Sequence, residues 1–444
     1  MTPSQRQHGS VLIIVLWIAF GLVSMALYFA QSMSFELRSA DNRVARVEAE
    51  QAIAGAARYA SNLLATVEEP GLWLDPLTYY YECEAVPVGT GLFWFLGRED
   101  RQDSTDQPYF SLVDEASKLN LNTATLEMLE LLPRMTPELA AAIIDWRDSD
   151  SDVSEGGAED ESYQRLNPSY VCKNGKFESI DELRLVYGMD LEILYGEDTN
   201  LNGILDPQEN DGDLSPPFDD RDGQLEPGLL EYVTVYTREP ATTSDGSTRI
   251  NVTSTNQQEL ATLLSEKLGS DRANQVLQQV TPTQTPVRSV LEFYLKSGMT
   301  AEEFILVETN LTVSTNTVEG LINVNTAGEV VLACVPGIGF DLAPSVVSYR
   351  QSNPDKLQSI TWVTQVLEST NAIAAGPYLT TRTYQVTADI VALGHQDRGF
   401  SRAKYVLDSS EGTPRVVFRQ DLTGLGWALG AEYRRNQLLA RKNR

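Results

Sequence analysis

The longest hydrophobic stretch of the chain lies close to its start. Residues 11–30 (VLIIVLWIAFGLVSMALYFA) contain no charged side chain, and about 20 such residues in a helix span the hydrocarbon core of a bilayer, which is roughly 30 Å thick. Apolar residues then recur at helical spacing, among them Val44, Ile53 and Leu63. The pattern predicts one long helix that spans a membrane first and is amphipathic afterwards.

A short polar leader, MTPSQRQHG, precedes this helix, and the apolar run ends without an A-x-A cleavage site. We therefore expect the helix to be retained. The junction of Gly9 and Ser10 resembles the class III leader of type IV pilins and type II secretion pseudopilins. That resemblance implies that a prepilin peptidase cleaves after Gly9 and methylates the new amine of Ser10. The alternative is an ordinary signal anchor.

A repeated pattern follows in the middle of the chain. Residues 118–149, 249–280 and 321–352 each show a short Leu/Ile-Asn segment, a helix, a turn and a second helix. These segments resemble the helix-hairpin-helix fold, which grips DNA phosphates through a PGIG-type turn. The third copy has the turn, but Phe340, Asp341 and Leu342 follow it where Lys or Arg would suit a phosphate. We expect packing modules rather than DNA-binding hairpins.

Between the first and second copies lies an acidic loop with the spacing of a calcium site. Residues 198–209 (DTNLNGILDPQE) place oxygen donors at positions 1, 3, 5, 7, 9 and 12 and a glycine at position 6. The predicted ligands are Asp198, Asn200, Asn202, the Ile204 carbonyl, Asp206 acting through a water, and Glu209. The alternative is a solvated acidic linker.

A degenerate copy of this loop follows at residues 219–228. It repeats the ending of the first loop but lacks the full set of ligands, and it predicts a second, weaker calcium site at Asp220, Asp222 and Glu226. For this copy a solvated linker is an equal alternative. The acidic stretch 145–160 is interpreted either as a cation or partner surface or as a solvated loop.

Alternating strands predict where a sheet forms. Segments at 109–114, 229–239 and the C-terminal run TYQVTADIVALG, RAKYVLDSS and RVVFRQDL have this pattern, and turn residues separate the last three into an antiparallel meander. The fold class predicted is α+β: a long N-terminal helix with an antiparallel sheet, interrupted by a large, mostly helical region.

Composition narrows the chemistry. A net charge of -28 over 444 residues argues against a nucleic-acid surface, and only the end of the chain is basic. Of two histidines, His8 lies in the leader, so no ordinary catalytic triad or His-rich zinc site is expected and the chain is predicted not to be an enzyme. Three cysteines allow at most one disulfide, which we assign to Cys83 and Cys172 because both lie in polar, turn-rich contexts.

Taken together the chain resembles the minor pseudopilins of type II secretion systems of the general secretion pathway protein K family. The resemblance rests on the Gly9–Ser10 junction and on five later motifs: DEASKLNLNTA, IIDWRDSDSD with GGAEDESY, SIDELRLVYG, GEDTNLNGILDPQE and INVNTAG. It implies a helical domain inserted into a pilin fold, calcium in the acidic loops, and assembly with other minor pseudopilins and the major pseudopilin. It also implies an inner-membrane anchor, a periplasmic domain and a role at the pseudopilus tip that starts assembly and supports export of folded proteins.

One departure from the pilin pattern is informative. Pilin-like subunits carry Glu at the fifth mature position, where it neutralises the amine of a neighbour; here that position is Ile14. A subunit without this carboxylate has no neighbour ahead of it to neutralise, as at a tip. A membrane-anchored helix-hairpin-helix DNA receptor and a minor pilin of a surface fibre remain alternative functions.

The predicted divisions of the chain follow from these assignments. They are a leader (1–9), a transmembrane helix (10–30), the rest of the pilin helix with the first part of a pilin-like domain (31–117), an inserted helical domain (118–375) with acidic loops near 196–228 and a strand near 230–238, a C-terminal sheet (376–422) and a basic tail (423–444).

Overall fold

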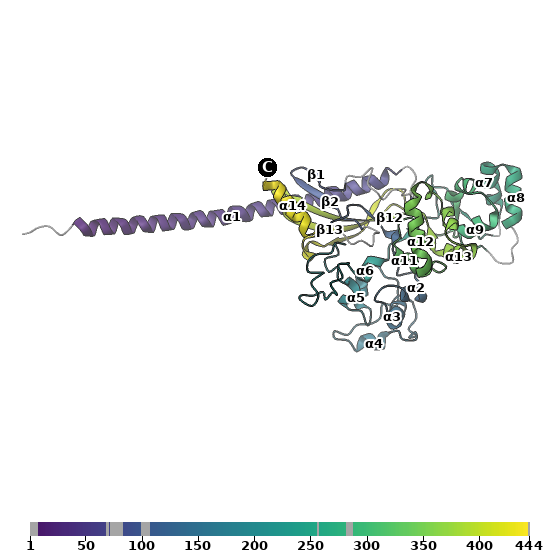
Figure 1. Cartoon of the computed structure of the whole chain (residues 1–444), viewed down its shortest axis with the longest axis horizontal. Coiled ribbons are helices and arrows are strands. Elements are labelled where there is room, and N and C mark those ends of the chain that lie inside the picture. Colours follow the sequence, from purple (N-terminus) through teal and green to yellow (C-terminus); the bar gives the residue numbers. More distant parts are fainter. Residues whose placement is uncertain are drawn as a thin grey trace, which may run out of the picture.

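The structure is a computed structural model that describes residues 8–67, 71, 83–98, 107–254, 257–280 and 287–442. Helix α1 (His8–Ala65) is continuous, and its N-terminal half projects away from the rest of the molecule (Figure 1). Within it, the apolar window has a mean hydropathy of 2.6 and none of that window is buried. The predicted long helix is confirmed. Most of the predicted leader, residues 1–7, lies outside the described residues.

The second half of α1 packs against a sheet through small side chains. One face carries alanines that are almost completely buried, namely Ala45, Ala49, Ala52, Ala56 and Ala60. Alanines at helical spacing let the helix axis approach the strands closely. Two glycines of the sheet complete the fit: a Cβ atom on Gly394 would lie 2.1 Å from the Ala45 carbonyl oxygen, and one on Gly399 would lie 2.2 Å from the Ala45 carbonyl carbon.

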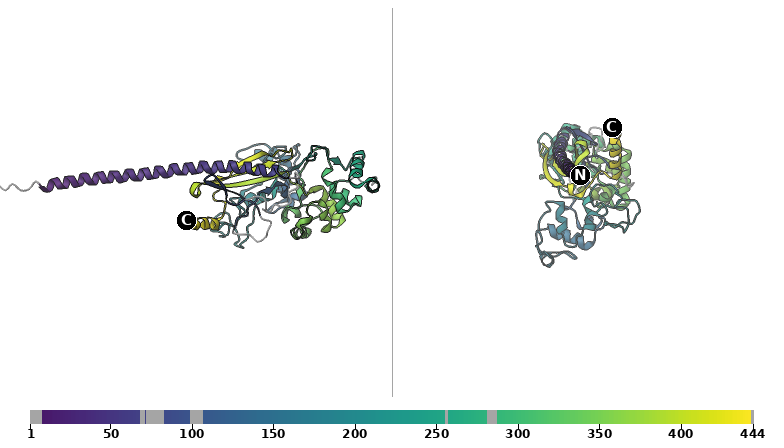
Figure 2. Two further views of the ribbon diagram at one scale, coloured as in Figure 1. Left: turned by 90° about the horizontal axis from the view of Figure 1, so that it is seen from above. Right: turned by 90° about the vertical axis from the view of Figure 1, so that its left-hand side faces the viewer.

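The main sheet is antiparallel and has the order β1-β2-β12-β13-β14, with β3 also pairing with β12. Its strands are β1 (Val86–Val88), β2 (Gly91–Phe95), β3 (Val113–Asp114), β12 (Gln385–Gly394), β13 (Arg398–Asp408) and β14 (Arg415–Asp421). The predicted C-terminal meander is present, with η7 (His395–Asp397) joining β12 to β13. Helix α1 covers one face of this sheet (Figure 2).

Two strand predictions need correction. The segment near Tyr232 does not join the main sheet, because it forms α6 (Leu229–Tyr232) and then β5 (Val233–Thr234), which pairs in parallel with β4 (Leu119–Asn120). The segment near Tyr109 contributes only the isolated bridge of Phe110 with Leu96 and the short strand β3. Strands β1 and β2, which the sequence pattern did not indicate, fill the edge beside β12 instead.

Between β3 and β12 the chain builds three helical units with a common plan: a short strand, two helices in a hairpin, further short helices, and a closing strand parallel to the first. Unit 1 contains β4, α2 (Leu126–Glu130), α3 (Pro137–Arg147), α4 (Asp160–Gln164), η2 (Ile180–Leu185), α5 (Leu191–Tyr195), α6 and β5. Unit 2 contains β7 (Ile250–Asn251), α7 (Gln258–Leu268), α8 (Ser270–Val280), α9 (Val290–Ser297), α10 (Ala301–Ile305), η3 (Glu308–Asn310) and β8 (Leu311–Thr312).

Unit 3 contains β10 (Ile322–Asn323), α11 (Glu329–Ala333), α12 (Gly339–Ser352), η4 (Pro354–Lys356), η5 (Ile360–Gln365), α13 (Ser369–Ala375), η6 (Gly376–Tyr378) and β11 (Leu379–Thr380). In each unit the first strand pairs in parallel with the last: β4 with β5, β7 with β8, and β10 with β11. A further pair, β6 (Arg238–Glu239) with β9 (Val318–Glu319), joins the segments that follow units 1 and 2.

The repetition extends to single hydrogen bonds. An arginine near the end of the second helix donates to two carbonyl groups ahead of the first helix. In unit 1 Arg147 donates to the carbonyls of Leu121 and Ala124. In unit 3 Arg350 donates at the same spacing, 3.0 Å to Val324 and 2.5 Å to Ala327. Units 1 and 3 therefore share the same local fold, including this arginine contact.

The buried apolar side chains form three separate clusters. One large cluster of buried apolar side chains runs through all three helical units, and a separate cluster lies between α1 and the main sheet. A small third cluster, which includes Trp94 and Leu393, lies on the other face of the sheet and packs against the segment before α14 (Ala431–Lys442). The described part of the predicted basic tail ends in helix α14. Tyr433 of this helix contacts the sheet, because its hydroxyl accepts a hydrogen bond from Trp94 Nε1 at 3.0 Å.

Candidate functional site

The predicted calcium loop lies in unit 1, directly after α5. Three of its predicted ligands are almost completely buried: Asp198 is 1% exposed, Asn202 1% and Glu209 2%. A solvated acidic linker would leave such side chains in water, because burying an unpaired carboxylate is costly. Burial therefore favours a built site over a linker.

Backbone amides orient the two end carboxylates of the loop. The carboxylate of Asp198 accepts hydrogen bonds from the amides of Asn202 and Gly203, each at 2.9 Å. Glu209 accepts from the amides of Thr199 at 3.2 Å and Asp206 at 3.0 Å. Gly203 has a φ of 70°, a conformation that side chains other than glycine rarely adopt.

The side-chain amides of the loop turn their nitrogens to one carboxylate. Asn200 Nδ2 and Asn202 Nδ2 each lie 2.9 Å from Asp206 Oδ2. This orientation leaves Asn200 Oδ1 buried, with no hydrogen-bond partner among the described residues. Ile204, whose carbonyl is the predicted backbone ligand, has a side chain that is only 2% exposed. An orphaned amide oxygen beside buried carboxylates is the donor set that a hard cation such as calcium prefers.

The charges of the loop point the same way. Burial, with the neighbouring charge of Asp198, raises the pKa of Glu209 to about 8, and burial also raises the pKa of Asp198. Within the described parts of the chain no three Asp, Glu, His or Cys side chains form a metal-binding group by themselves. A cation here would thus draw on amide and backbone oxygens as well as carboxylates. The residues present fit calcium on this basis.

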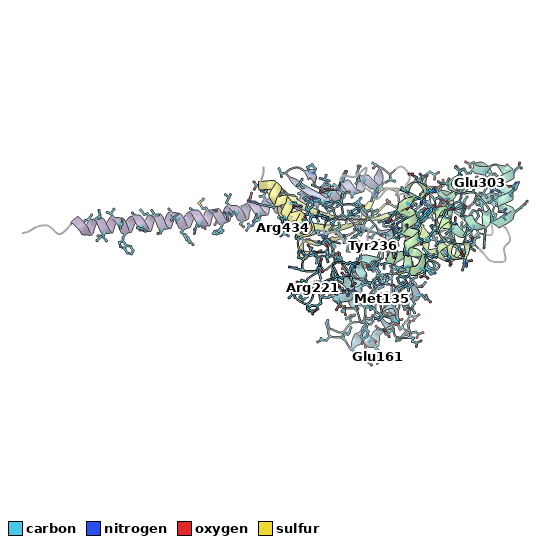
Figure 3. All side chains as sticks on the ribbon, viewed as in Figure 1. Met135, Glu161, Arg221, Tyr236, Glu303 and Arg434 are labelled. Carbon is cyan, nitrogen blue, oxygen red and sulfur yellow. The ribbon has the colours of Figure 1, made fainter. Side chains whose placement is uncertain are left out.

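The second acidic loop differs. Asp220, Asp222 and Glu226 are all exposed, and Figure 3 shows the neighbouring Arg221 at the periphery of the body. Asp220 accepts from the amide of Asp222 at 3.0 Å, and Glu226 forms an ion pair with Arg134 at 3.0 Å. Asp222 accepts a hydrogen bond from the amide of Gln224 at 2.7 Å. Each of the three carboxylates thus has a local partner, and the loop is not buried as the first one is.

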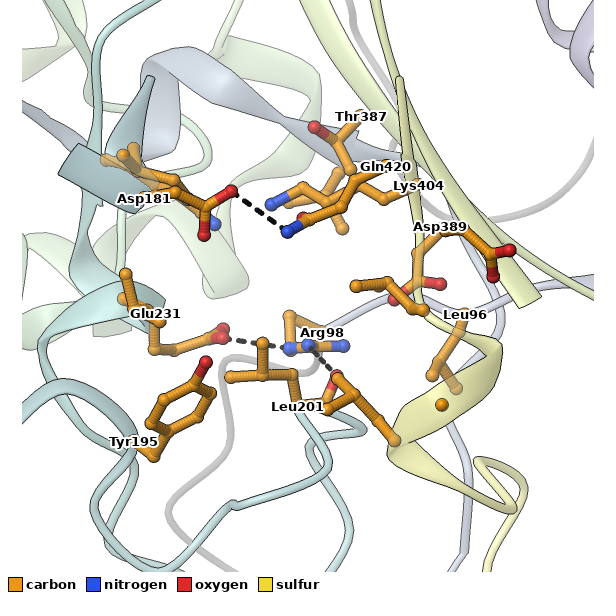
Figure 4. Close-up of a pocket in the computed structure, with 18 of the residues that line it drawn as sticks. Leu96, Arg98, Asp181, Tyr195, Leu201, Glu231, Thr387, Asp389, Lys404 and Gln420 are labelled. Carbon is orange, nitrogen blue, oxygen red and sulfur yellow. Dashed lines mark hydrogen bonds and ion pairs between the residues drawn. The ribbon is translucent and has the colours of Figure 1, made fainter. Parts of the chain in front are cut away.

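Two arginines fasten the first loop to the main sheet, and sequence analysis did not identify them. Arg402 on β13 is completely buried and pairs with Asp389 on β12 at 2.6 Å. Its guanidinium also donates to the carbonyls of Asn200 and Leu201, each at 2.6 Å. Arg98 donates to the same Leu201 carbonyl at 2.7 Å, as Figure 4 shows. The sequence did contain one indication of this pair. Asp389 and Arg402 are charged residues inside the otherwise strand-like segments ADIV and SRAK.

The DEASKLN motif supplies a buried polar junction. Asp114 accepts hydrogen bonds from Asn323 at 2.9 Å and from Thr326 and Thr383 at 2.5 Å each, and burial raises its pKa to about 6. Glu115 accepts from Thr234 of unit 1 and from Thr387 of β12. Two adjacent acidic residues thus join units 1 and 3 to the sheet.

The predicted disulfide is wrong. Cys83, Cys172 and Cys334 are all free thiols. Cys83 belongs to the core between α1 and the sheet, whereas Cys172 belongs to the core of the helical units. Burial raises the pKa of Cys172 to about 11 and that of Cys83 to about 12. The turn-rich sequence around both cysteines concealed their separation into different cores.

The glycine turn of the third hairpin has a packing role. Gly337 has a φ of 87°, and a Cβ atom there would lie 2.5 Å from the carbonyl oxygen of Asn371 on α13. The turn is therefore pressed against α13, and Phe340 beyond it is 61% exposed.

The predicted processing residues lie at the free end of α1. Gly9 and Ser10 are in its first turn, and Ile14 is 58% exposed on the projecting part of the helix. The first side chain of α1 to become buried is Ala45. More than half of the helix thus has no intramolecular contact surface.

Comparison with known proteins gives consistent matches to one family. The family model described as "Type II secretion system (T2SS), protein K" matches residues 111–195, from just before β3 to the end of α5. Type II secretion system protein K of Klebsiella pneumoniae is 41% identical over 71 residues, which are 16% of this chain and 22% of the relative. The predicted calcium loop begins just beyond the matched family segment.

Longer alignments reach more of the chain. Type II secretion system protein K of Pectobacterium carotovorum subsp. carotovorum is 25% identical over 197 residues, 42% of this chain and 60% of the relative. The Aeromonas hydrophila protein K is 29% identical over 208 residues, 44% of this chain and 62% of the relative. The chain therefore spans less than two thirds of the length of each of these relatives.

A solved structure, the GspK-GspI-GspJ complex from the enterotoxigenic Escherichia coli type 2 secretion system, contains a chain that is also similar. The match covers 85% of this chain and 99% of the solved chain, at 13% identity and a TM-score of 0.33. Superposition at this level adds no argument to the sequence matches.

Proposed function

Because residues 111–195 match the family model of type II secretion system protein K and parts of the chain are similar to proteins of that name, we propose that the chain belongs to this family and is a minor pseudopilin at the tip of a periplasmic pseudopilus. There it would start assembly with other minor pseudopilins and support export of folded proteins across the outer membrane. The observation that carries the proposal is the family match at residues 111–195, in a chain whose long apolar helix packs on an antiparallel sheet. The protein K family is structural, so no catalytic activity is assigned.

The projecting half of α1 is proposed as the inner-membrane anchor. Its side chains from Val11 to Ala30 are exposed and include no charged group, an arrangement that is costly in water but favourable in hydrocarbon. Prepilin peptidase would cleave after Gly9 and methylate Ser10. On the tip hypothesis Ile14 needs no acidic replacement, so Ile14→Glu should leave secretion unchanged or reduce it. A clear gain in secretion would contradict the tip position.

Assembly partners are proposed by family. The sequence matches to protein K support the proposal. Because the name of the solved complex gives GspK together with GspI and GspJ, we propose that this chain assembles with the two corresponding minor pseudopilins and joins the major pseudopilin below them. The helical region would then be a domain inserted into a pilin-type fold, with helix-hairpin-helix-like units that serve packing.

Calcium is proposed as the resident ion of the first loop. Asp198, Asn200, Asn202, the Ile204 carbonyl, Asp206 and Glu209 would hold it. When bound, calcium supplies the positive charge that two buried, neighbouring carboxylates lack. The residues of the chain do the rest: Asp198 and Glu209 are held by loop amides, and Arg402 and Arg98 hold the loop on the sheet.

The experiment for assembly is co-purification. The tagged chain, extracted from membranes in detergent, should retain its two candidate minor pseudopilins, and less of them after treatment with a calcium chelator. Recovery of the folded chain without either partner, at saturating calcium, would contradict the proposed function.

The experiment for the ion is calorimetric titration of the purified chain with calcium. Glu209→Gln should abolish binding tighter than millimolar, because it removes a buried ligand charge. Asp222→Asn, in the exposed second loop, is the matched control and should leave that binding intact. Equal loss in both variants, or no such binding in the unaltered chain, would exclude the first loop as the site.

A further inference from the structure

A cavity of about 240 Å³ lies between the main sheet and unit 1 (Figure 4). The sheet lines it with residues of β12, β13 and β14, and unit 1 lines it with residues of η2, α5 and α6. At a share of about 30 Å³ for each water, the space is enough for roughly eight waters. Neither the calcium proposal nor the family match assigns a role to this cavity.

The carboxylates that line the cavity already have partners. Glu231 of unit 1 pairs with Arg98 at 3.0 Å, and Asp181 accepts a hydrogen bond from Gln420 at 2.9 Å. Asp389 is paired with Arg402. Asp421, the fourth carboxylate of the lining, accepts a hydrogen bond from the amide of Thr423 at 2.9 Å. Two of the four carboxylates are thus paired with arginines, and the other two accept hydrogen bonds from neutral groups.

The two lysines of the cavity are not matched in this way. Lys118, 8% exposed, stands directly before β4, and Lys404 is half-buried on β13, opposite Gln420 of β14. Among the described residues neither ammonium group has an acceptor within hydrogen-bond or ion-pair distance. Each ammonium carries three donors, so the cavity contains six N–H groups without a protein acceptor from the described chain.

Lys118 and Lys404 line the same cavity, and their positive charges affect each other. Burial and the neighbouring Lys118 lower the pKa of Lys404. Burial acts to raise the pKa of Glu115, behind the cavity, but the charges of Lys118 and Lys404 and the hydrogen bonds from two threonines together outweigh it, so that this pKa lies below its ordinary value. The oxygens of Glu115 are occupied by Thr234 and Thr387. Glu115 thus offsets the two lysines at a distance without accepting their hydrogen bonds.

We propose that this cavity binds a small dianionic oxyanion, an inorganic phosphate or a short dicarboxylate, between the ammonium groups of Lys118 and Lys404. Leu96, Leu230 and Leu422 line the same space with apolar surface, which weakens the competition of water for the ammonium groups. Because Lys404 belongs to the sheet and Lys118 to the start of unit 1, the bound anion tightens the contact between them.

The test is titration of the purified, calcium-loaded chain with inorganic phosphate and, separately, with succinate, at constant ionic strength set by chloride. We expect one binding event per chain for at least one of the two anions, together with a rise in melting temperature, because a ligand of the folded state stabilises it. Comparison of the two anions shows which class of oxyanion the cavity prefers.

Variants separate the cavity from general surface binding. Lys118→Met and Lys404→Met should each weaken binding of the anion by about tenfold or more, since each removes a charge-assisted hydrogen bond. Lys356→Met, an exposed lysine on η4, is the matched control and should bind as the unaltered chain does. Lys404→Arg keeps the charge and should retain most of the affinity.

The outcome that overturns the proposal is equally definite. Absence of binding by both anions at millimolar concentration, or equal weakening by Lys356→Met and Lys404→Met, excludes the cavity as an oxyanion site. Calcium titration of each variant shows that it is folded. A failure here leaves the calcium loop and the assembly function untouched, because neither uses Lys118 or Lys404.

Discussion

The two faces of strand β12 are both buried, yet they are built from opposite chemistry. Toward α1 the strand presents Val386, Ala388, Ile390 and Ala392, which join the apolar core. Toward the helical units it presents Gln385, Thr387 and Asp389, none more than 5% exposed. Antiparallel sheets usually bury one face and leave the polar one in water. Here the polar face is covered as completely as the apolar face.

The difference lies in what each face requires of its partner. The apolar face needs shape, which the alanines of α1 and the glycines of the β12–β13 hairpin provide. The polar face needs a specific hydrogen-bond partner for each buried group: Thr387 donates to Glu115, and Asp389 binds Arg402. Loss of one partner on this face leaves a buried polar group unpaired, at a cost that a small apolar truncation does not incur. The polar face therefore fixes which surface of the helical region can dock.

The largest expected effect is on the charged pair of the polar face. Arg402→Met leaves Asp389 buried without its cation and removes both bonds to the calcium loop, so we expect a loss of about 3–5 kcal/mol in the free energy of unfolding. Urea unfolding of the chain in detergent measures it. The double variant Asp389→Leu with Arg402→Met should recover part of the loss. A single variant as stable as the unaltered chain would contradict the role of the pair.

The next effect is on a neutral group of the same face. Thr387→Val keeps the shape of the side chain but removes the hydroxyl that donates to the buried Glu115, and should cost about 1–3 kcal/mol. The same unfolding measurement applies. Thr387→Ser, which keeps the hydroxyl, is the control and should retain most of the stability; equal losses would mean that packing, not the hydrogen bond, is responsible.

A matched truncation on the apolar face should cost less. Ile390→Val removes one methylene beside α1, and such changes typically cost about 0.5–1.5 kcal/mol. If this variant proves less stable than Thr387→Val, the contrast between the two faces is wrong. Calcium affinity should not change, because Ile390 lies on the face away from the loop.

The smallest effect concerns the edge where α1 meets the sheet. His395 Nδ1 lies 2.7 Å from Glu48 and Nε2 2.9 Å from Asp41, both on α1, while Arg398 also pairs with Asp41. The hydrogen bonds to Asp41 and Glu48 raise the pKa of His395 above its unfolded value of about 6.5. The stabilisation is complete below that unfolded value and is lost as pH rises through the folded pKa.

The contact of His395 with α1 can be measured by hydrogen exchange of the α1 amides near Asp41, at slightly acidic and at mildly alkaline pH. Exchange should be faster at the alkaline value after correction for intrinsic rates. His395→Gln should abolish the difference. Protection that increases as pH rises would have the wrong sign for a histidine held between carboxylates.

Part of this architecture could be predicted from sequence. Residues 11–30 predicted α1 because a long run of apolar residues without a charge is typical of a membrane-spanning helix. The repeated Leu/Ile-Asn segments predicted units 1 to 3 because a repeated sequence pattern indicates a repeated local fold. The loop pattern predicted Asp198 and Glu209 as ligands of one ion, and that assignment stays a prediction. Its alternative, a solvated linker, disagrees with the burial of both carboxylates.

The rest depends on long-range contacts. Alternation along β12 shows that its two faces differ, but not that the polar face is covered. Arg402 contacts Asn200 and Leu201 from far along the chain, so the local pattern that sets this arginine apart does not show which loop it contacts. The segment near Tyr232 alternates like a strand, yet its backbone pairs with β4 to close unit 1 rather than with the sheet. The disulfide prediction failed for the same reason, because the sequence around a cysteine does not show which hydrophobic core it joins.

The pairing of β3 with β12 has a consequence for the order in which the molecule forms during synthesis. Asp114 faces Val386 across this ladder, and all three helical units are made between the two strands. Each unit closes with its own parallel strands and shares its core with the other units, so the helical region can be packed while the sheet still lacks its central strand. The surface that receives the alanines of α1 is finished only when β12 and β13 emerge. Helix α1 is thus synthesised first but is among the last elements to pack in its final position.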